Sequence, residues 1–165
     1  MRGSAYRLPG LVHRLLLPAV IGFTLAALPG CSSPVERGAE PTAQSDSAEL
    51  VQEAVDFGDW VLPADGKVLM VKRENPDDVE YNLVVETSPA GLTSMLEGSG
   101  YRAEFSETRP MVFQPIAGPP LDTSPRVLRA QDLHVSRVGK SMIRDVYVDE
   151  RTVDLRIVHI EFRGQ

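Results

Sequence analysis

Residues 67–86 read KVLMVKRENPDDVEYNLVVE and predict the hairpin around which the fold is built. The first seven residues centre on the apolar run Val68–Val71, which is typical of a buried strand. From Val79 to Glu86 apolar and polar residues alternate, and this period of two indicates a strand with one buried face. Between the two lies the turn sequence Asn75-Pro76-Asp77-Asp78. We therefore expect two antiparallel strands joined by a loop of about four to five residues.

A helix is predicted on the N-terminal side of this hairpin. Asp46-Ser47-Ala48-Glu49 has the form of a capping box, in which Asp46 caps the first turn and Glu49 reaches back. Apolar residues then recur at helical spacing, which predicts a short amphipathic helix over about 47–57. Gly58 is expected to end it, because glycine readily adopts the left-handed conformation that closes a helix.

A second helix and a third strand are predicted directly after the hairpin. Ser88 followed by Pro89 is the usual pair at the N-cap and first position of a helix, and Gly98 is expected to end this helix. From Tyr101 to Ser106 apolar and polar residues alternate again, which predicts a strand.

The C-terminal third is predicted to hold two further strands, residues 141–148 and 152–162. In the second of them the apolar residues change from odd to even numbers after Ile157, which we interpret as a strand buried on both faces at its middle. Residues 127–138 show weaker strand character. The long segment 107–127 contains five prolines with apolar residues between them. It is expected to lie across the domain, either as a crossover that covers a sheet edge or as a surface offered to a partner.

Together these elements predict an α+β fold. Successive strands joined by short turns favour a mainly antiparallel sheet of about five strands, with one or two helices on one face. The predicted domain is a single unit over residues 47–165. It has to be stable through its own core, since the only cysteine, Cys31, leaves no intramolecular disulfide.

The N-terminal thirty residues have the layout of an export signal. They carry three arginines and no acidic residue, and an apolar run follows from Leu15 to Leu28. A membrane-spanning helix needs about 20 apolar residues. This run is shorter, and Pro18 removes one of its helical hydrogen bonds. We therefore expect a cleavable signal rather than a permanent span.

The end of this run resembles the signal of a bacterial lipoprotein precursor. Leu28, Gly30 and Cys31 match the pattern of an aliphatic residue, a small residue and a cysteine, whereas Pro29 stands where Ala, Ser or Thr is more usual. The resemblance implies a diacylglyceryl group on the Cys31 sulfur, cleavage between Gly30 and Cys31, and acylation of the new amino terminus. Several acyl chains on one cysteine make a stable anchor, whereas a single chain holds only marginally.

The resemblance also implies the place and the organisation of the protein. It predicts a lipid-anchored protein on the extracytoplasmic face of a cell membrane, with a signal peptide over residues 1–30. The lipidated cysteine and a flexible tether would occupy residues 31–46, whose polar composition does not support a core. The arrangement from Val68 to Tyr101 resembles that of small actinobacterial lipoproteins, and this resemblance implies no particular activity.

The charge balance argues against two classes of partner. The chain has 17 basic and 23 acidic residues, a net charge of −6, and loss of the three leader arginines would bring the remainder to −9. Binding of nucleic acid requires a basic surface, so we do not expect it. Electrostatic adhesion to anionic headgroups is disfavoured for the same reason, which leaves the lipid on Cys31 to hold the protein at the membrane.

The remaining chemistry-bearing residues are few. Ser136 lies two residues from His134, so on a strand the two side chains would share a face, as a hydrolase would require. A second hypothesis is a metal site built from His134, His159 and a carboxylate such as Asp145. For each pair or group we favour a structural role, and we expect no cofactor.

Acidic residues near turns have structural explanations too. Asp77, Asp78 and Glu80 are predicted to form a solvated turn, because the spaced acids and glycine of a calcium loop are missing. Asp56 and Asp59 flank a predicted helix end, where capping roles account for them.

We therefore expect a lipid-anchored envelope protein with a small, non-catalytic domain that binds a protein or a small ligand. One alternative is a small envelope hydrolase that uses His134 and Ser136. Another is a carrier of a small apolar molecule, which would require an enclosed cavity between sheet and helix.

Overall fold

The computed structural model describes residues 43–74, 79–109, 113–136 and 139–164. The leader, Gly30, Cys31, nearly all of the predicted tether and the turn 75–78 lie outside the described residues. The described part belongs to one compact unit, Glu36–Gln165.

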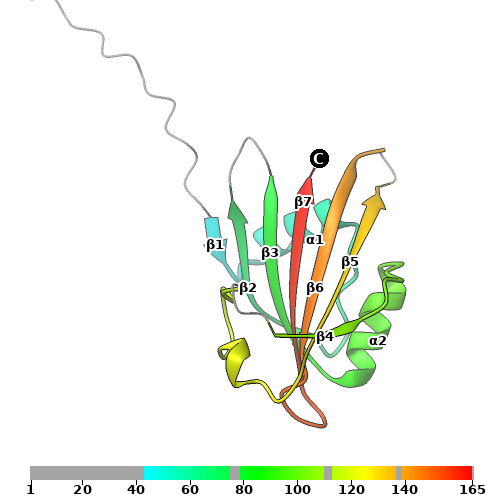
Figure 1. Cartoon of the computed structure of the whole chain (residues 1–165). Helices are drawn as coiled ribbons and strands as arrows, with labels where there is room; N and C mark the ends of the chain where they lie inside the picture. The colour runs from blue at the N-terminus through cyan, green and yellow to red at the C-terminus, as the bar shows by residue number, and fades with distance from the viewer. Residues whose placement is uncertain (1–42, 75–78, 110–112, 137–138, 165) are drawn as a thin grey trace, which may run out of the picture. The chain divides into compact units, whose positions relative to one another are not determined.

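The described residues of this unit form two helices and a seven-stranded antiparallel sheet (Figure 1). The helices are α1 (Ala48–Gly58) and α2 (Pro89–Gly98), and a 3-10 turn η1 (Leu121–Thr123) precedes the fifth strand. The strands are β1 (Ala43–Ser45), β2 (Lys67–Glu74), β3 (Glu80–Thr87), β4 (Ser106–Thr108), β5 (Val127–Val135), β6 (Ser141–Asp149) and β7 (Arg156–Gly164). Their order across the sheet is β1-β2-β3-β7-β6-β5-β4.

The main core lies between the helices and one face of the sheet. Fully buried side chains from both layers meet there, among them Ala54 of α1, Met95 of α2 and Phe162 of β7. Trp60, just after α1, packs its ring 5.6 Å from that of Phe162 and closes one end of the core. Gly58 fits over the same Phe162 ring, which leaves no room for a Cβ atom at the end of α1. We call this the helix face, and the opposite side of the sheet the open face.

The predicted hairpin and fold class are confirmed. β2 and β3 pair antiparallel from Lys67–Glu86 to Glu74–Glu80, with one bulge between Val68 and Met70. Both helices contribute to the core on one face of the sheet. In β7 the successive residues Ile157 to Ile160 are all buried, with their side chains on alternate faces, as the change of apolar parity in this strand predicted.

The expected number of about five strands is too low. β1 pairs with β2, so residues 43–45, assigned to the tether, belong to the sheet, and the domain begins before residue 47. Residues 127–135 form a full strand, and the last strand begins only at Arg156. The helices begin and end close to where the sequence predicted them.

Two local predictions need correction. The N-cap of α1 is Ser47, not Asp46, because the Ser47 hydroxyl accepts a hydrogen bond from the Leu50 N–H. Residues 101–105 are not in a strand, and pairing begins only at Ser106. Alternation in that segment reflects burial, since Tyr101 packs its ring 5.7 Å from Trp60 in the core.

Candidate functional site

The lower part of the open face is covered by residues 113–126, which we call the strap. In Figure 1 the strap, with η1, lies in front of the lower part of the sheet and returns along its lower end to β5. Phe113 stacks on Tyr147 of β6 at 4.4 Å between ring centroids, and Leu121 is buried in the same small apolar cluster. The expectation that this proline-rich segment lies across the domain is confirmed for its described part.

Arg151 and Asp149 hold the strap to the sheet. The Arg151 guanidinium donates to the Pro120 carbonyl at 3.1 Å and to the Thr123 hydroxyl at 2.7 Å, and it is paired with the buried Asp149. The Ser124 hydroxyl donates to the same Asp149 carboxylate. These contacts hold the strap against the sheet. They support its role as a structural crossover rather than as a surface offered to a partner.

His159 lies under the strap with no hydrogen-bond partner for either ring nitrogen among the described residues. Phe113 meets the ring edge to face at 5.6 Å, and only 2% of the residue is exposed. Burial lowers the pKa of His159 to about 4; Asp149 opposes the shift, and Arg151 adds to it. The imidazole is therefore neutral at neutral pH.

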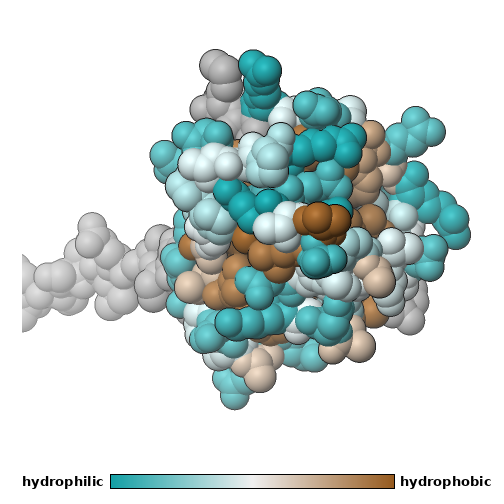
Figure 2. Space-filling model, turned by 90° about the horizontal axis from the view of Figure 1, so that it is seen from below, coloured by the Kyte–Doolittle hydropathy of each residue, from teal (hydrophilic) through white to brown (hydrophobic). Residues whose placement is uncertain are grey.

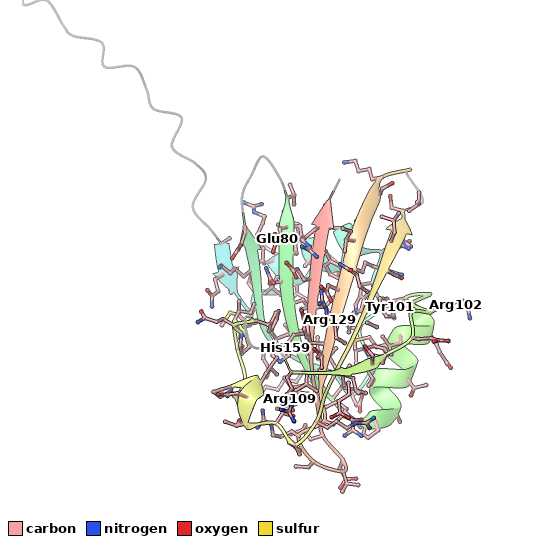
Figure 3. All side chains as sticks on the ribbon, viewed as in Figure 1. Glu80, Tyr101, Arg102, Arg109, Arg129 and His159 are labelled. Carbon is pink, nitrogen blue, oxygen red and sulfur yellow. The ribbon has the colours of Figure 1, made fainter. Side chains whose placement is uncertain are left out.

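Above the strap, charged side chains cross the open face from strand to strand. Arg129 of β5 makes a bidentate pair with the buried Asp145 of β6, with N–O distances of 2.9 and 2.5 Å. Arg163 of β7 approaches Asp145 at 3.7 Å and Glu161 at 3.6 Å. Figure 3 shows Glu80, Arg129 and His159 on three different strands of this face. We call Glu80, Arg129, Asp145, Glu161 and Arg163 the charged row.

Glu80 and Glu161 make the row chemically unusual. The strand register places Glu161 opposite Asn82, and the Asn82 amide donates to Glu80 at 3.2 Å. Burial and a hydrogen bond with Glu80 raise the pKa of Glu161 to about 7. Glu161 therefore retains its proton closer to neutral pH than an ordinary glutamate does. The sequence predicted Glu80 both on the polar face of the strand 79–86 and in an acidic turn. Glu80 is the first residue of β3, and only the pairing of β3 with β7 reveals Glu161 as its neighbour.

His134 faces a separate open pocket of about 470 Å³ at the ends of α1 and α2. Its Nε2 atom lies 3.4 Å from the Asp59 carboxylate. Asp59 caps the C-terminus of α1 in the left-handed conformation, which confirms a capping role for this residue. Ser99, the C-cap of α2, also lines the pocket, but its hydroxyl accepts a hydrogen bond from the Val61 N–H.

The structure does not bring His134 and Ser136 together in one site. Ser136 lies in the turn after β5, where its hydroxyl accepts a hydrogen bond from the Lys140 N–H. It is not among the residues that line the pocket of His134. The partner that sequence reasoning missed is Asp59, which is 75 positions away along the chain.

The proposed metal ligands are also separated. His134 and His159 lie on opposite faces of the sheet, the first on the helix face and the second on the open face with Asp145. Within the described ranges, no group of three or more His, Cys, Asp or Glu side chains is arranged to hold a metal ion.

A further surface cavity of about 460 Å³ lies between β4 and η1. Arg126, on its wall, is paired with Glu150 at 3.0 Å and approaches Glu107 at 3.5 Å. Viewed from below, the surface at the lower end of the domain shows apolar patches bordered by hydrophilic residues (Figure 2).

No protein-family model, curated protein or solved structure matches this chain. In the described part of the chain, neither helix has the length and apolar character needed to cross a membrane.

Proposed function

We propose that this protein is a lipid-anchored, extracytoplasmic binding protein whose charged row contacts a polar partner in the cell envelope. The row is the observation that supports this proposal most directly. It spans four strands, β3, β7, β6 and β5, above the strap, and its acids and bases are paired with one another rather than arranged around a nucleophile. Such alternating charges favour recognition of a polar surface by complementary pairs.

The anchor rests on Cys31, which lies outside the described residues. The chain enters the sheet at Ala43, in the outer strand β1. Residues 31–42 would then form the tether, and a flexible chain of that length spans about 20 Å. This reach places the domain close to the membrane while leaving it free to turn toward a partner.

The experiment is a pull-down from crosslinked membranes with four forms of the full chain: wild type, Cys31→Ser, Glu80→Lys and Glu97→Lys. Glu97 is an exposed residue of α2, so its reversal matches Glu80→Lys in charge at a different surface. We expect wild type and Glu97→Lys to sediment with membranes and to retain the same partners. Cys31→Ser should leave the membrane fraction, because no acyl chain would hold it.

The Glu80→Lys form should remain at the membrane and lose its partners, since a lysine at position 80 lies opposite Arg163, repels it and changes the charge pattern that the row presents to a partner. An unchanged set of partners in Glu80→Lys would contradict the role of the charged row. A Cys31→Ser form that still sediments with membranes would contradict the anchor.

A hydrolase remains the second candidate because of the His134–Asp59 pair. A histidine oriented by a carboxylate in an open pocket has the arrangement of a general base. Ester hydrolysis by the purified full chain that His134→Gln abolishes and Ser136→Ala leaves intact would support this candidate. Equal rates in wild type and His134→Gln would exclude it.

The carrier hypothesis has less support. It requires an enclosed cavity between the helices and the sheet. That layer is filled by side chains such as Met95, Ile160 and Phe162, which are at most 2% exposed.

A further inference from the structure

The upper half of β5 is an exposed sheet edge. β4 pairs with β5 only at Val127–Arg129. Beyond Arg129, β6 is the only described strand paired with β5. Figure 1 shows this end of β5 at the outer side of the sheet, far from β1.

The peptide groups of three residues point outward from this edge. The Ser136 N–H donates to the Lys140 carbonyl, and the Glu150 N–H donates to the Arg126 carbonyl. Even-numbered residues of β5 therefore direct their peptide groups toward β6. Because alternate residues of an antiparallel strand bond to opposite sides, Gln131, Leu133 and Val135 direct theirs outward. Each offers one donor and one acceptor.

The side chains on this edge do not protect it. Leu133 and Val135 are 64% and 58% exposed and lie on the open face, two residues apart. Natural edge strands are usually blunted by lysine, proline, a bulge or an inward charge. The segment 131–135 has no lysine or proline, and its inward acid, Asp132, is neutralised by a bidentate pair with Arg144.

We propose that two copies of this protein associate through residues 131–135 of β5, antiparallel about a two-fold axis at Leu133. In this register Leu133 faces Leu133 of the second copy, and Gln131 faces Val135. All the outward donors and acceptors of the three residues are then paired. An antiparallel edge is self-complementary about a two-fold axis, so the contact closes as a dimer and does not extend into a fibre.

Complementary side-chain pairs in this register favour a second copy as the occupant. The same register places Asp132 of one copy opposite His134 of the other, on the helix face and at a non-hydrogen-bonded position where side chains are closest. The Leu133–Leu133 pair on the open face lies on the two-fold axis and occurs once, whereas the Asp132–His134 pair on the helix face occurs twice by symmetry. A register centred on His134 would instead place two histidines opposite each other. It would also leave Gln131 without a partner among residues 131–135 of the second copy.

The dimer is expected to be weak in solution, because five residues bury much less than a standard interface. It does not depend on the proposed function, since the β5 edge is distinct from the charged row that would bind a partner. Anchoring both copies to one membrane would raise their effective concentration.

The first test is site-specific crosslinking in the full chain carrying Cys31→Ser, solubilised in mild detergent, so that an introduced thiol is the only one. Leu133→Cys is treated with a short bis-maleimide. The control is Val153→Cys, whose native side chain is 83% exposed in the turn between β6 and β7. We expect covalent dimers at Leu133→Cys with a yield about tenfold above the control, because the two-fold register places the thiols opposite each other. Equal yields at both positions would overturn the proposal.

The second test measures association of the lipidated chain by sedimentation velocity in detergent. Leu133→Lys places like charges opposite each other across the axis and should move the monomer–dimer midpoint to a concentration at least about tenfold higher. Val153→Lys should leave the midpoint unchanged. Circular dichroism confirms that both variants fold. A wild type that stays monomeric at every concentration, or a Leu133→Lys variant that dimerises like wild type, would overturn the proposal.

Discussion

Replacing Arg144 by methionine is expected to lower the free energy of unfolding by about 3–4 kcal/mol. Arg144 lies on the helix face of β6 and is 1% exposed, so its charge is removed from water. The cost arises because its partner, Asp132, would lose both hydrogen bonds while its carboxylate remains partly buried. Asp132 is 21% exposed in its side chain, which places the expected loss toward the lower end of the range for broken buried pairs.

The contacts of Arg144 are ones that no other side chain can reproduce. Its guanidinium makes two hydrogen bonds to Asp132 and a third, of 2.9 Å, to the carbonyl of Ser99, which is the C-cap of α2. The same group lies 5.5 Å from the Trp60 ring and 5.3 Å from the Tyr101 ring. It therefore joins the sheet, the end of α2 and the aromatic end of the core. Arg144→Lys should also be destabilising, since one ammonium does not reproduce the planar fork.

Urea denaturation of wild type and variants at pH 7 measures this prediction. The matched control is Arg126→Met, which also breaks arginine–carboxylate pairs, but at a side chain that is 53% exposed. Exposed pairs contribute about 0–1 kcal/mol, so the control should be close to wild type. Equal losses for the two variants would show that burial of Arg144 is not what makes it important.

Local structure was predictable from the sequence because its signals are local. The alternation in Val79–Glu86, the Ser88-Pro89 helix start and the doubly buried middle of β7 each depend on neighbours within a few residues. The alternation along each strand also predicts which of its side chains share one face of the sheet. Strand β1 was not predicted, because its three residues are too few to show an alternating pattern.

The candidate sites depend on pairing between distant strands, which no local pattern encodes. Glu80 meets Glu161 because β3 pairs with β7 rather than with the next strand along the chain. Arg144 meets the Ser99 carbonyl across 45 positions, and His134 meets Asp59 across 75. The strand order that produces these meetings follows from how the whole core closes, so it appears only in the folded structure.

The pH dependence of stability is expected to combine two opposing contributions from one strand, His159 and Glu161. The folded-state pKa of His159 is lowered to about 4 by burial, from an ordinary value of 6.5. Between these values the unfolded chain binds more protons. The contribution of His159 is therefore complete above pH 6.5 and is lost as the pH falls toward 4, by about 3 kcal/mol.

Glu161 has the opposite sign. Its folded-state pKa is raised to about 7 from an ordinary value of 4.5, by burial and by the hydrogen bond with Glu80. Its contribution is complete below pH 4.5 and is lost as the pH rises through 7. Because the carboxyl group is only half-buried, solvent screening reduces this contribution to about 1–2 kcal/mol. Wild type should therefore show only a shallow rise in stability from pH 4.5 to 6.5.

Two variants separate the contributions, because each removes one titrating group. Glu161→Gln should steepen the rise between pH 4.5 and 6.5 and stabilise the protein at pH 7.5. His159→Leu should reverse the slope, so that stability falls from pH 4.5 to 7.5, and it leaves no buried imidazole to protonate. Urea denaturation at four pH values across this range measures the differences from wild type, in which the titration of groups that do not interact with the replaced residue cancels. Glu97→Gln, on the exposed side of α2, is the control, and its free energy of unfolding should change with pH in parallel with that of wild type. If the free energy of unfolding of His159→Leu also changed with pH in parallel with that of wild type, the ring of His159 would have to be hydrated under the strap. Burial of this ring would then not control the stability of the fold in acid.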